Sequence, residues 1–256
     1  MLFFEEFGDG SGPILLLLHG LGVNGAVWDR VCAGLPPTLR VIVPDFAGHG
    51  RSPRRKNYSL GGHAADVAGL LPAGTRLSVL GHSMGGGVGM LLATGWFGVT
   101  VERLVTVGMK LDWTPEETAK MGRPFPVRWF DSREDAARRF LTVTGLAGIV
   151  PGEARTVERS LVEDGGRFRL ATDPETVRVV GPHTPAMIAA AAASGAVIRL
   201  TCGSRDPLVT LPEMRRFDPA AFTIDGGHNV HVENADAVAA SITRLTSEEP
   251  RSSLPG

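Results

Sequence analysis

The chain has few cysteines, almost no net charge and no long hydrophobic run. Only Cys32 and Cys202 occur among 256 residues, which excludes a disulfide framework or a cysteine zinc cluster. Lys and Arg number 26 against 27 Asp and Glu, so the formal net charge is -1 and gives no overall field for nucleic acid or an anionic membrane. The apolar run in the first expected strand, Ile14–Leu18, is far too short to span a bilayer. These absences predict a protein without nucleic-acid or membrane partners.

The two ends of the chain carry weaker signals. Residues 1–6 lack the basic stretch and small-residue cleavage site of a secretory signal, so we expect a cytoplasmic protein. The polar residues 247–256 include Pro250 and Pro255 and are expected to form a flexible tail. Between them the composition, 43% hydrophobic and 21% charged, is typical of a globular protein.

Short apolar segments alternate with segments of helical periodicity along most of the chain. The expected strands are residues 14–18, 40–44, 76–80, 101–107 and 197–202, with 221–224 as a shorter strand-like run. The expected helices are residues 27–35, 61–71, 85–94, 185–194 and 237–245. Most of these strands lack polar alternation, as do strands buried on both faces of a parallel sheet. The pattern predicts an α/β fold with a mostly parallel, doubly wound sheet.

One long segment interrupts this alternation. Residues 111–184 contain no convincing buried strand, and helical patterns occur at 133–141, 152–163 and 173–179. We expect a helical cap here, over the carboxyl-terminal edge of the sheet, where open α/β sheets bind their ligands. The core then comprises residues 1–110 and 185–246. The alternative is that these helices merely extend the core.

A serine lies in a tight turn between a predicted strand and a predicted helix. Residues 81–85 read Gly-His-Ser-Met-Gly, which fits the G-x-S-x-G pattern in the required context. The turn forces Ser83 into a strained backbone conformation, and larger residues in place of Gly81 and Gly85 would collide. At this helix N-terminus the Met84 N–H is placed to stabilise an oxyanion. Ser83 is therefore the candidate nucleophile.

A serine hydroxyl needs a base, and two later turns supply a base and an acid. His228 lies in a glycine-rich turn before the last helix and is the candidate base. Asp206 directly follows a predicted strand and is the candidate acid. Asp112, which follows an earlier strand, is a rival acid, but the turn at Asp206 fits the commoner pattern. The order Ser83, Asp206, His228 is one used by serine hydrolases.

Five blocks of sequence together resemble the α/β-hydrolase superfamily, in its serine hydrolase and esterase branch with a cap domain. They are His19-Gly20-Leu21-Gly22, residues 45–52, the serine turn, the Asp206 turn and residues 227–234. The resemblance covers nearly the whole chain. It implies that the Leu21 N–H is the second oxyanion donor and that the cap is inserted after the sixth strand.

Several large side chains are candidates for the substrate pocket. Trp113 and Trp129 belong to a group of aromatic residues in the cap that either face an apolar ligand or pack the cap's own core. Met109 ends the strand before the cap, His82 precedes the nucleophile and His183 ends the cap. We take these five residues as possible pocket residues.

The remaining histidines are expected to have structural roles. His19 braces the oxyanion turn through hydrogen bonds, His49 sits in a turn, and His63 and His231 lie in helices. No histidine pair has the helix-face spacing of a metalloprotease site. We therefore predict no metal and no cofactor.

A glycine pattern also fits a dinucleotide-binding site. Gly20, Gly22 and Gly25 follow a predicted strand, and Asp45 lies 20 residues after Gly25, where an acid would bind a ribose. An NAD(P)-dependent oxidoreductase is thus an alternative, although it leaves the Ser83 turn unexplained. A hydrolase-like ligand sensor without activity is another, although a binding protein has no need of all three triad groups.

The residues favour acyl transfer through an acyl-enzyme on Ser83, with a small carboxylic ester, thioester or lactone as substrate. Serine at the turn argues against the related dehalogenases and epoxide hydrolases, which resemble this chain but use aspartate there. Carbon–carbon bond hydrolases are the enzymatic rival. Their ring-cleavage type has asparagine before the serine, and a menaquinone-pathway synthase of this fold has tyrosine there, where this chain has His82.

Overall fold

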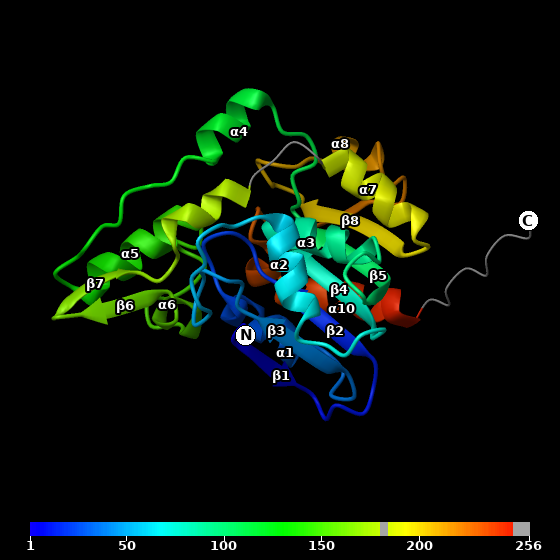
Figure 1. Cartoon of the computed structure of the whole chain (residues 1–256), viewed down its shortest axis with the longest axis horizontal. Coiled ribbons are helices and arrows are strands. Elements are labelled where there is room, and N and C mark those ends of the chain that lie inside the picture. The colour runs from blue at the N-terminus through cyan, green and yellow to red at the C-terminus, as the bar shows by residue number, and fades with distance from the viewer. Residues whose placement is uncertain (180–183, 248–256) are drawn as a thin grey trace, which may run out of the picture.

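The structure, a computed structural model, describes residues 1–179 and 184–247. A seven-stranded sheet with the order β1-β3-β2-β4-β5-β8-β9 forms its centre. Its strands are β1 (Phe4–Phe7), β2 (Ile14–Leu18), β3 (Arg40–Pro44), β4 (Arg76–His82), β5 (Thr100–Val107), β8 (Val197–Gly203) and β9 (Phe222–Ile224). β1 is antiparallel to β3 and the other neighbouring strands are parallel (Figure 1). The predicted mostly parallel sheet is confirmed.

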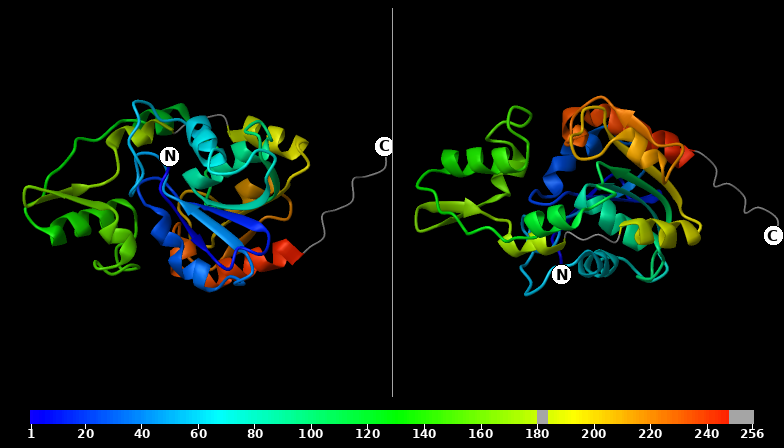
Figure 2. Two further views of the ribbon diagram at one scale, coloured as in Figure 1. Left: turned by 60° about the horizontal axis from the view of Figure 1, so that its bottom comes forward. Right: turned by 90° about the horizontal axis from the view of Figure 1, so that it is seen from above.

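Helices cover both faces of this sheet, as Figure 2 shows. One face packs against α2 (Leu60–Ala68), α3 (Met84–Ala93) and α7 (Thr184–Ala193). The other packs against α1 (Asp29–Ala33) and α10 (Ala235–Ser247). Three short helices lie in the connections: η1 (Gly25–Trp28), α8 (Leu211–Arg215) and α9 (Val230–Glu233). The doubly wound arrangement is therefore also confirmed, and no described helix is long and apolar enough to cross a membrane.

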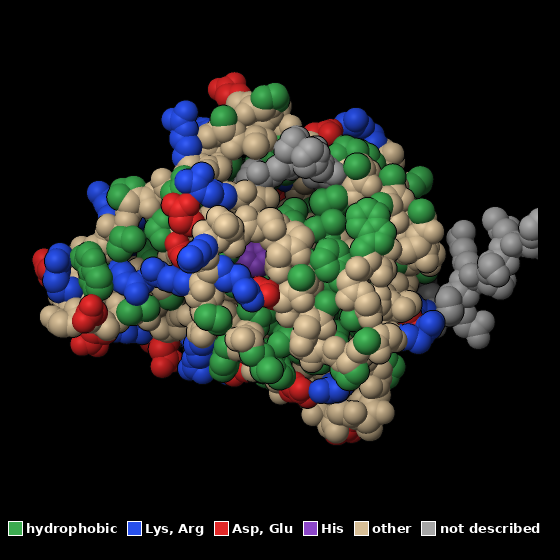
Figure 3. Space-filling view, in the orientation of Figure 1, with side chains coloured by type: hydrophobic (Ala, Val, Ile, Leu, Met, Phe, Trp, Pro, Cys, Tyr) green, Lys and Arg blue, Asp and Glu red, His purple; other side chains and the backbone are tan. Residues whose placement is uncertain are grey.

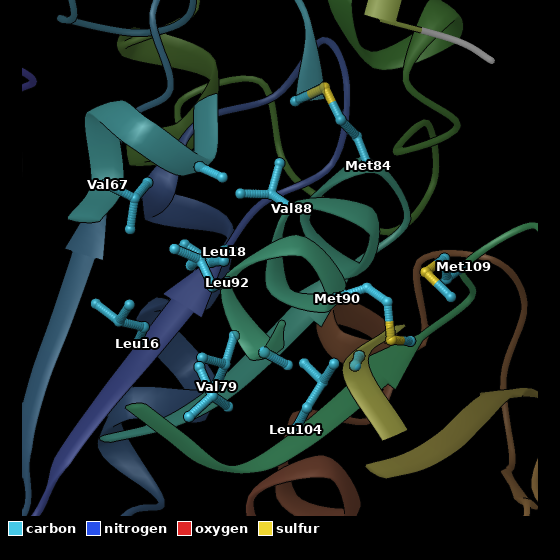
Figure 4. Close-up of a cluster of buried hydrophobic side chains, with 14 of the residues drawn as sticks. Leu16, Leu18, Val67, Val79, Met84, Val88, Met90, Leu92, Leu104 and Met109 are labelled. Atoms are coloured by element: carbon cyan, nitrogen blue, oxygen red, sulfur yellow. The ribbon is translucent and has the colours of Figure 1, made fainter. Parts of the chain in front are cut away.

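The central strand β2 shows why its sequence has no polar alternation. Leu16 and Leu18 enter the core on the α3 side, drawn in Figure 4, whereas Leu15 and Leu17 enter the core on the α1 side. All four are almost completely buried. Burying a leucine side chain contributes about 2 kcal/mol, so each face of the strand stabilises one of the two layers.

The first strand was not predicted, and the position of the insertion differs from the prediction. β1 carries Glu5 and Glu6 and forms the sheet's edge, where charged residues are common and an apolar run is not needed. Only this short strand precedes β2, so the insertion follows the fifth strand, β5, and not a sixth.

The insertion between β5 and α7 is only partly helical. It contains α4 (Pro115–Met121), α5 (Arg133–Val143), α6 (Arg155–Glu158), a hairpin of β6 (Leu161–Asp164) and β7 (Arg167–Leu170), and the 3₁₀ helix η2 (Pro174–Val179). In Figure 1, α5, α6 and the hairpin lie together beside the sheet, and α4 stands apart above them. α4 has no buried residue. The role of the whole insertion, residues 111–184, as a cap stays a prediction.

The predicted helix at 152–163 is wrong over most of its length. Only α6 is helical there, and the segment continues as the first strand of the hairpin. Gly165 and Gly166 form its turn with φ of 57° and 78°. Two successive positive φ values are what a two-residue hairpin turn requires, so this glycine pair was the sequence signal for strands. The predicted helix at 133–141 is confirmed as α5.

Candidate active site

The candidate catalytic residues lie in four connections at one edge of the sheet. Leu21 follows β2, Ser83 follows β4, Asp206 follows β8 and His228 follows β9. These strands are parallel, so their carboxyl ends meet at this edge. Residues far apart in the sequence are thereby brought to one place.

Ser83 lies in a strained turn at the N-terminus of α3. Its φ of 50° and ψ of -114° make it the one non-glycine residue with positive φ in the described part of the chain. An alanine Cβ at Gly81 would stand 2.3 Å from the Gly85 carbonyl oxygen, and one at Gly85 would stand 2.2 Å from the Leu18 carbonyl oxygen. Both glycines are therefore required by close backbone contacts, and the turn presents Ser83 to the space above the sheet.

His228 and Asp206 form a hydrogen-bonded pair. The His228 Nδ1 lies 2.9 Å from the Asp206 Oδ2, and the aspartate side chain is fully buried. The other carboxylate oxygen accepts from the Leu208 N–H over 2.8 Å. Because an ionised carboxylate only accepts, the proton lies on Nδ1 and leaves Nε2 free to take one. Gly108, with φ of 63°, passes beside this pair, and a Cβ there would stand 3.0 Å from Oδ2.

The rival acid, Asp112, lies in a different environment. It is half-exposed and pairs with the Arg216 guanidinium over 2.7 Å. The structure thus gives Asp206, and not Asp112, as the partner of His228.

The turn that carries Leu21 is held by His19. The His19 Nδ1 lies 2.7 Å from the Gly20 carbonyl oxygen, and its Nε2 accepts from the Phe46 N–H over 3.0 Å. His19 is buried, and burial lowers its pKa, so the ring stays neutral and keeps both bonds. The bracing predicted for His19 is confirmed. It fixes the backbone beside Leu21, which lines the same cavity as Met84.

His82 connects the serine turn to the turn of His228. Its Nε2–H donates to the His228 carbonyl oxygen over 3.0 Å, across 146 residues of sequence. The ring lies 4.0 Å from the His231 ring, centre to centre, and His231 lies 4.7 Å from the Trp28 ring. Burial, with His231 and His228 alongside, holds the pKa of His82 well below the ordinary value. A neutral, buried ring therefore supports the backbone of the candidate base.

A cavity of about 790 Å³ opens in front of Ser83 and His228. His82, Met109 and Trp113 line it, as predicted for the pocket. Trp129 is not among its lining residues and instead contacts Arg169, whose guanidinium carbon lies 5.6 Å from the ring centre. Its neighbour Phe130 lines the cavity in its place. His183 lies outside the described residues.

One further polar residue ties the base to the insertion and was missed from the sequence. The Asn229 Nδ2–H donates to the carbonyl oxygens of Thr144 and Gly145, over 2.9 and 3.2 Å. Asn229 follows His228 directly and lines the cavity. The only signal in the sequence was its place in the block 227–234.

The glycine pattern of a dinucleotide site has another explanation. Asp45 is buried, and its carboxylate accepts from the Gly25 N–H over 2.7 Å and the Arg51 N–H over 2.9 Å. Both oxygens are therefore bonded to the protein backbone and do not face a ribose. The structure gives no support to the oxidoreductase alternative.

Several proteins are similar in sequence to part or most of this chain. The magnesium-chelatase 30 kDa subunit of Rhodobacter capsulatus is 30% identical over 93% of this chain and 88% of its own. The pimeloyl-[acyl-carrier protein] methyl ester esterase of Aeromonas hydrophila is 45% identical over 35% of this chain and 34% of its own. The chain spans 29% of the length of the mycobacterial relatives that match at 43% identity, which are uncharacterised.

The fold is shared with solved structures. A thioesterase domain from the curacin biosynthetic pathway superposes with a TM-score of 0.78 at 22% identity, over 94% of each chain. At this identity the likeness concerns the fold alone. The model of the alpha/beta hydrolase family matches residues 15–241, from the first central strand into the last helix. The chain belongs to the alpha/beta hydrolase family.

Proposed function

We propose that this protein is a serine hydrolase that cleaves small carboxylic esters or thioesters through an acyl-enzyme on Ser83. The observation that carries the proposal is that His228, hydrogen-bonded to buried Asp206, lines the same cavity as Ser83 in its strained turn. Such a pair turns a weakly nucleophilic serine hydroxyl into an effective nucleophile.

In the first step the Ser83 Oγ attacks the carbonyl carbon, and the His228 Nε2 takes the hydroxyl proton. The Ser83 Oγ forms no hydrogen bond among the described residues, so the attack needs it turned toward His228 as substrate binds. The N–H groups of Leu21 and Met84 bind the resulting oxyanion. The bond to the leaving oxygen or sulfur then breaks, and His228 gives that atom the proton.

In the second step water attacks the acyl-enzyme and His228 takes one of its protons. The carbonyl carbon then loses the Ser83 oxygen, which recovers its proton from His228, and the acid product leaves. Asp206 stays ionised throughout and stabilises the charged imidazole. The names of relatives support this reaction class, since one is a methyl ester esterase and one solved neighbour is a thioesterase domain.

Hydrolysis of p-nitrophenyl esters of graded acyl length tests the proposal. We expect turnover that falls by about four to six orders of magnitude in Ser83→Ala, because triad members act as a unit. Ser78→Ala makes the same change on β4 away from the cavity and should keep full activity. A folded wild-type protein that turns over none of these esters would contradict the proposal and favour carbon–carbon bond hydrolysis or a binding role without activity.

A second candidate is a binding subunit without activity of its own. It is favoured by a relative that matches 93% of the chain, which is a subunit of magnesium chelatase. The same experiment separates the two functions, because a binding subunit shows no turnover that depends on Ser83.

A further inference from the structure

All the Lys, Arg, Asp and Glu side chains that line the cavity in front of Ser83 among the described residues are positively charged. Lys110, Lys120, Arg123, Arg128 and Arg139 line it, whereas no aspartate or glutamate of the described chain does. All five come from the segment just after β5 and from α4, α5 and the loop between them. In Figure 3, charged side chains of both signs lie over the insertion, while the face over α2, α3 and α7 is largely uncharged, so the single sign belongs to the cavity wall.

This charge does not follow from the composition of the segment. Residues 112–139 contain six acidic and six basic residues, but four of the bases and none of the acids line the cavity. The adjacent arginines of α5 show the sorting directly. Arg139 lines the cavity, whereas Arg138 does not and pairs with Asp135 over 2.7 Å. The fold thus places four of the six positive side chains of a neutral segment, and none of its negative ones, on the cavity.

The cavity cations are also available to a ligand. Lys110 pairs with Glu117 over 3.1 Å, but Lys120, Arg123, Arg128 and Arg139 have no ion-pair partner among the described residues. An unpaired cation on a cavity wall attracts an anion and loses no existing partner when it binds one.

Apolar side chains lie between these cations. Met121, Phe125 and Val127 line the cavity, yet 40–50% of the surface of each residue is exposed. Three exposed apolar side chains on one cavity wall offer a surface that an apolar ligand would cover. A ligand that suits this wall therefore has an apolar chain together with a negatively charged group.

We propose that the insertion forms an anion subsite, and that the acyl substrate of Ser83 carries a carboxylate or phosphate away from its scissile carbonyl. The inference rests on the proposed function and names its substrate class. The apolar chain lies against Phe125 and its apolar neighbours, and the anion lies among Arg123, Arg128 and Arg139. Because these cations are exposed, each contributes about a two- to fivefold gain in affinity at low salt.

Binding to Ser83→Ala protein tests the subsite without catalysis. The binding of octanoate and of octyl phosphate is measured by calorimetry and compared with that of neutral octanamide. The two anions distinguish a carboxylate from a phosphate as the charged group of the substrate. We expect at least one anion to bind about five- to twentyfold more tightly than octanamide at low salt, and the difference to shrink at high salt. The anion with the larger preference identifies the chemical group.

The carboxylate of octanoate could also bind to the proposed oxyanion donors, the N–H groups of Leu21 and Met84. Two arginine variants therefore test whether the anion binds at the proposed subsite. In the Ser83→Ala background, Arg139→Gln should weaken anion binding about two- to fivefold and leave a smaller preference over octanamide. Arg138→Gln removes the same charge one residue away, outside the cavity, and should leave the preference unchanged.

In Ser83-containing protein the same variants are compared on p-nitrophenyl octanoate and its counterpart with a terminal carboxylate. Arg139→Gln should lower the ratio of kcat/KM for the charged ester to that for the neutral one. Equal binding of anions and octanamide, or equal effects of the two arginine variants, would overturn the subsite. A preference for anions that depends on Arg139, in a protein without ester turnover, would support the subsite and reject the proposed function.

Discussion

At the scale of the residue, His82 is the side chain that holds the candidate base in place. It is buried, and its Nε2–H donates to the His228 carbonyl oxygen over 3.0 Å. His82→Phe keeps a ring in this space and removes the hydrogen bond. We expect kcat to fall about five- to tenfold, because the bond contributes about 1 kcal/mol and a misplaced base adds to the loss. We expect KM to change by less than about twofold.

His63→Phe is the matched control for this prediction. His63 is a buried histidine of α2, its Nε2 has no partner, and it does not line the cavity. Ester hydrolysis by this variant should have the wild-type kcat. If both variants lose kcat equally, His82 has only a packing role.

The residues of the site differ in how far the sequence alone predicts them. Ser83, Asp206 and His228 stand in local turns whose glycines and order are visible in the chain. The contact of His82 joins turns 146 residues apart, so no local pattern indicates it. Trp129 was misplaced for a related reason, since nothing in a loop sequence tells whether an aromatic ring faces the cavity or Arg169.

At the scale of the element, the approach of α3 to the sheet depends on glycine. An alanine Cβ at Gly85 would stand 2.2 Å from the Leu18 carbonyl oxygen, which belongs to rigid backbone. We expect Gly85→Ala to lower the free energy of unfolding by about 2 kcal/mol or more, because α3 must move away from β2. Urea unfolding measures this loss.

Gly61→Ala makes the same glycine-to-alanine change at a helical position that has room for the added Cβ. Gly61 lies in α2, and a Cβ there would meet nothing within 4 Å. Alanine is the better helix former, so we expect the free energy of unfolding to rise by about 0.5 to 1 kcal/mol. A stable Gly85→Ala protein beside a stable Gly61→Ala protein would show that the α3 contact is more adaptable than its geometry implies.

Strands of the sheet were predictable because burial on both faces leaves short apolar runs, as in β2 and β3. The insertion was less predictable, because its short elements pack on one another and few are buried. The sequence of α4 carries a clear capping box from Thr114 to Glu117 but no apolar face. An expectation based on hydrophobic periodicity passes over such a helix.

At the scale of the whole molecule, burial of histidines makes the fold sensitive to acid. Five are buried among the described residues: His19, His49, His63, His82 and His231. Burial lowers the pKa of each of them, to about 4 for His63 and about 3 for His231. The folded protein therefore keeps these rings neutral at pH values where the unfolded chain charges them.

Below the ordinary histidine pKa of about 6.5, the unfolded chain binds protons that the folded protein does not. The stability that depends on these neutral histidines is therefore fully retained above pH 7. As the pH drops from about 6.5 toward about 4, the free energy of unfolding falls by up to about 1.4 kcal/mol per pH unit for each histidine. Urea unfolding between pH 8 and pH 5 should show this steep loss.

His231→Phe is the variant that separates this cause from protonation of carboxylates. Neither ring nitrogen of His231 has a hydrogen-bond partner, so phenylalanine keeps its contact with Trp28 and removes one titrating group. The loss of stability between pH 6.5 and pH 5 should be shallower in this variant. An unchanged slope would assign the acid sensitivity to other groups.

The two ends of the insertion give the fold a modular character. The chain leaves the sheet after β5 and returns through α7 to β8, and these two strands are hydrogen-bonded neighbours. The β5–β8 ladder thus does not depend on the length of the insertion. Phe140, Leu146 and Val157 of the insertion belong to the core on the α1 side, so a replacement segment has to supply apolar side chains there. For the proposed serine hydrolase, such a cassette would let substrate preference diverge between descendants, or be transplanted in the laboratory, while Ser83, Asp206 and His228 keep their places.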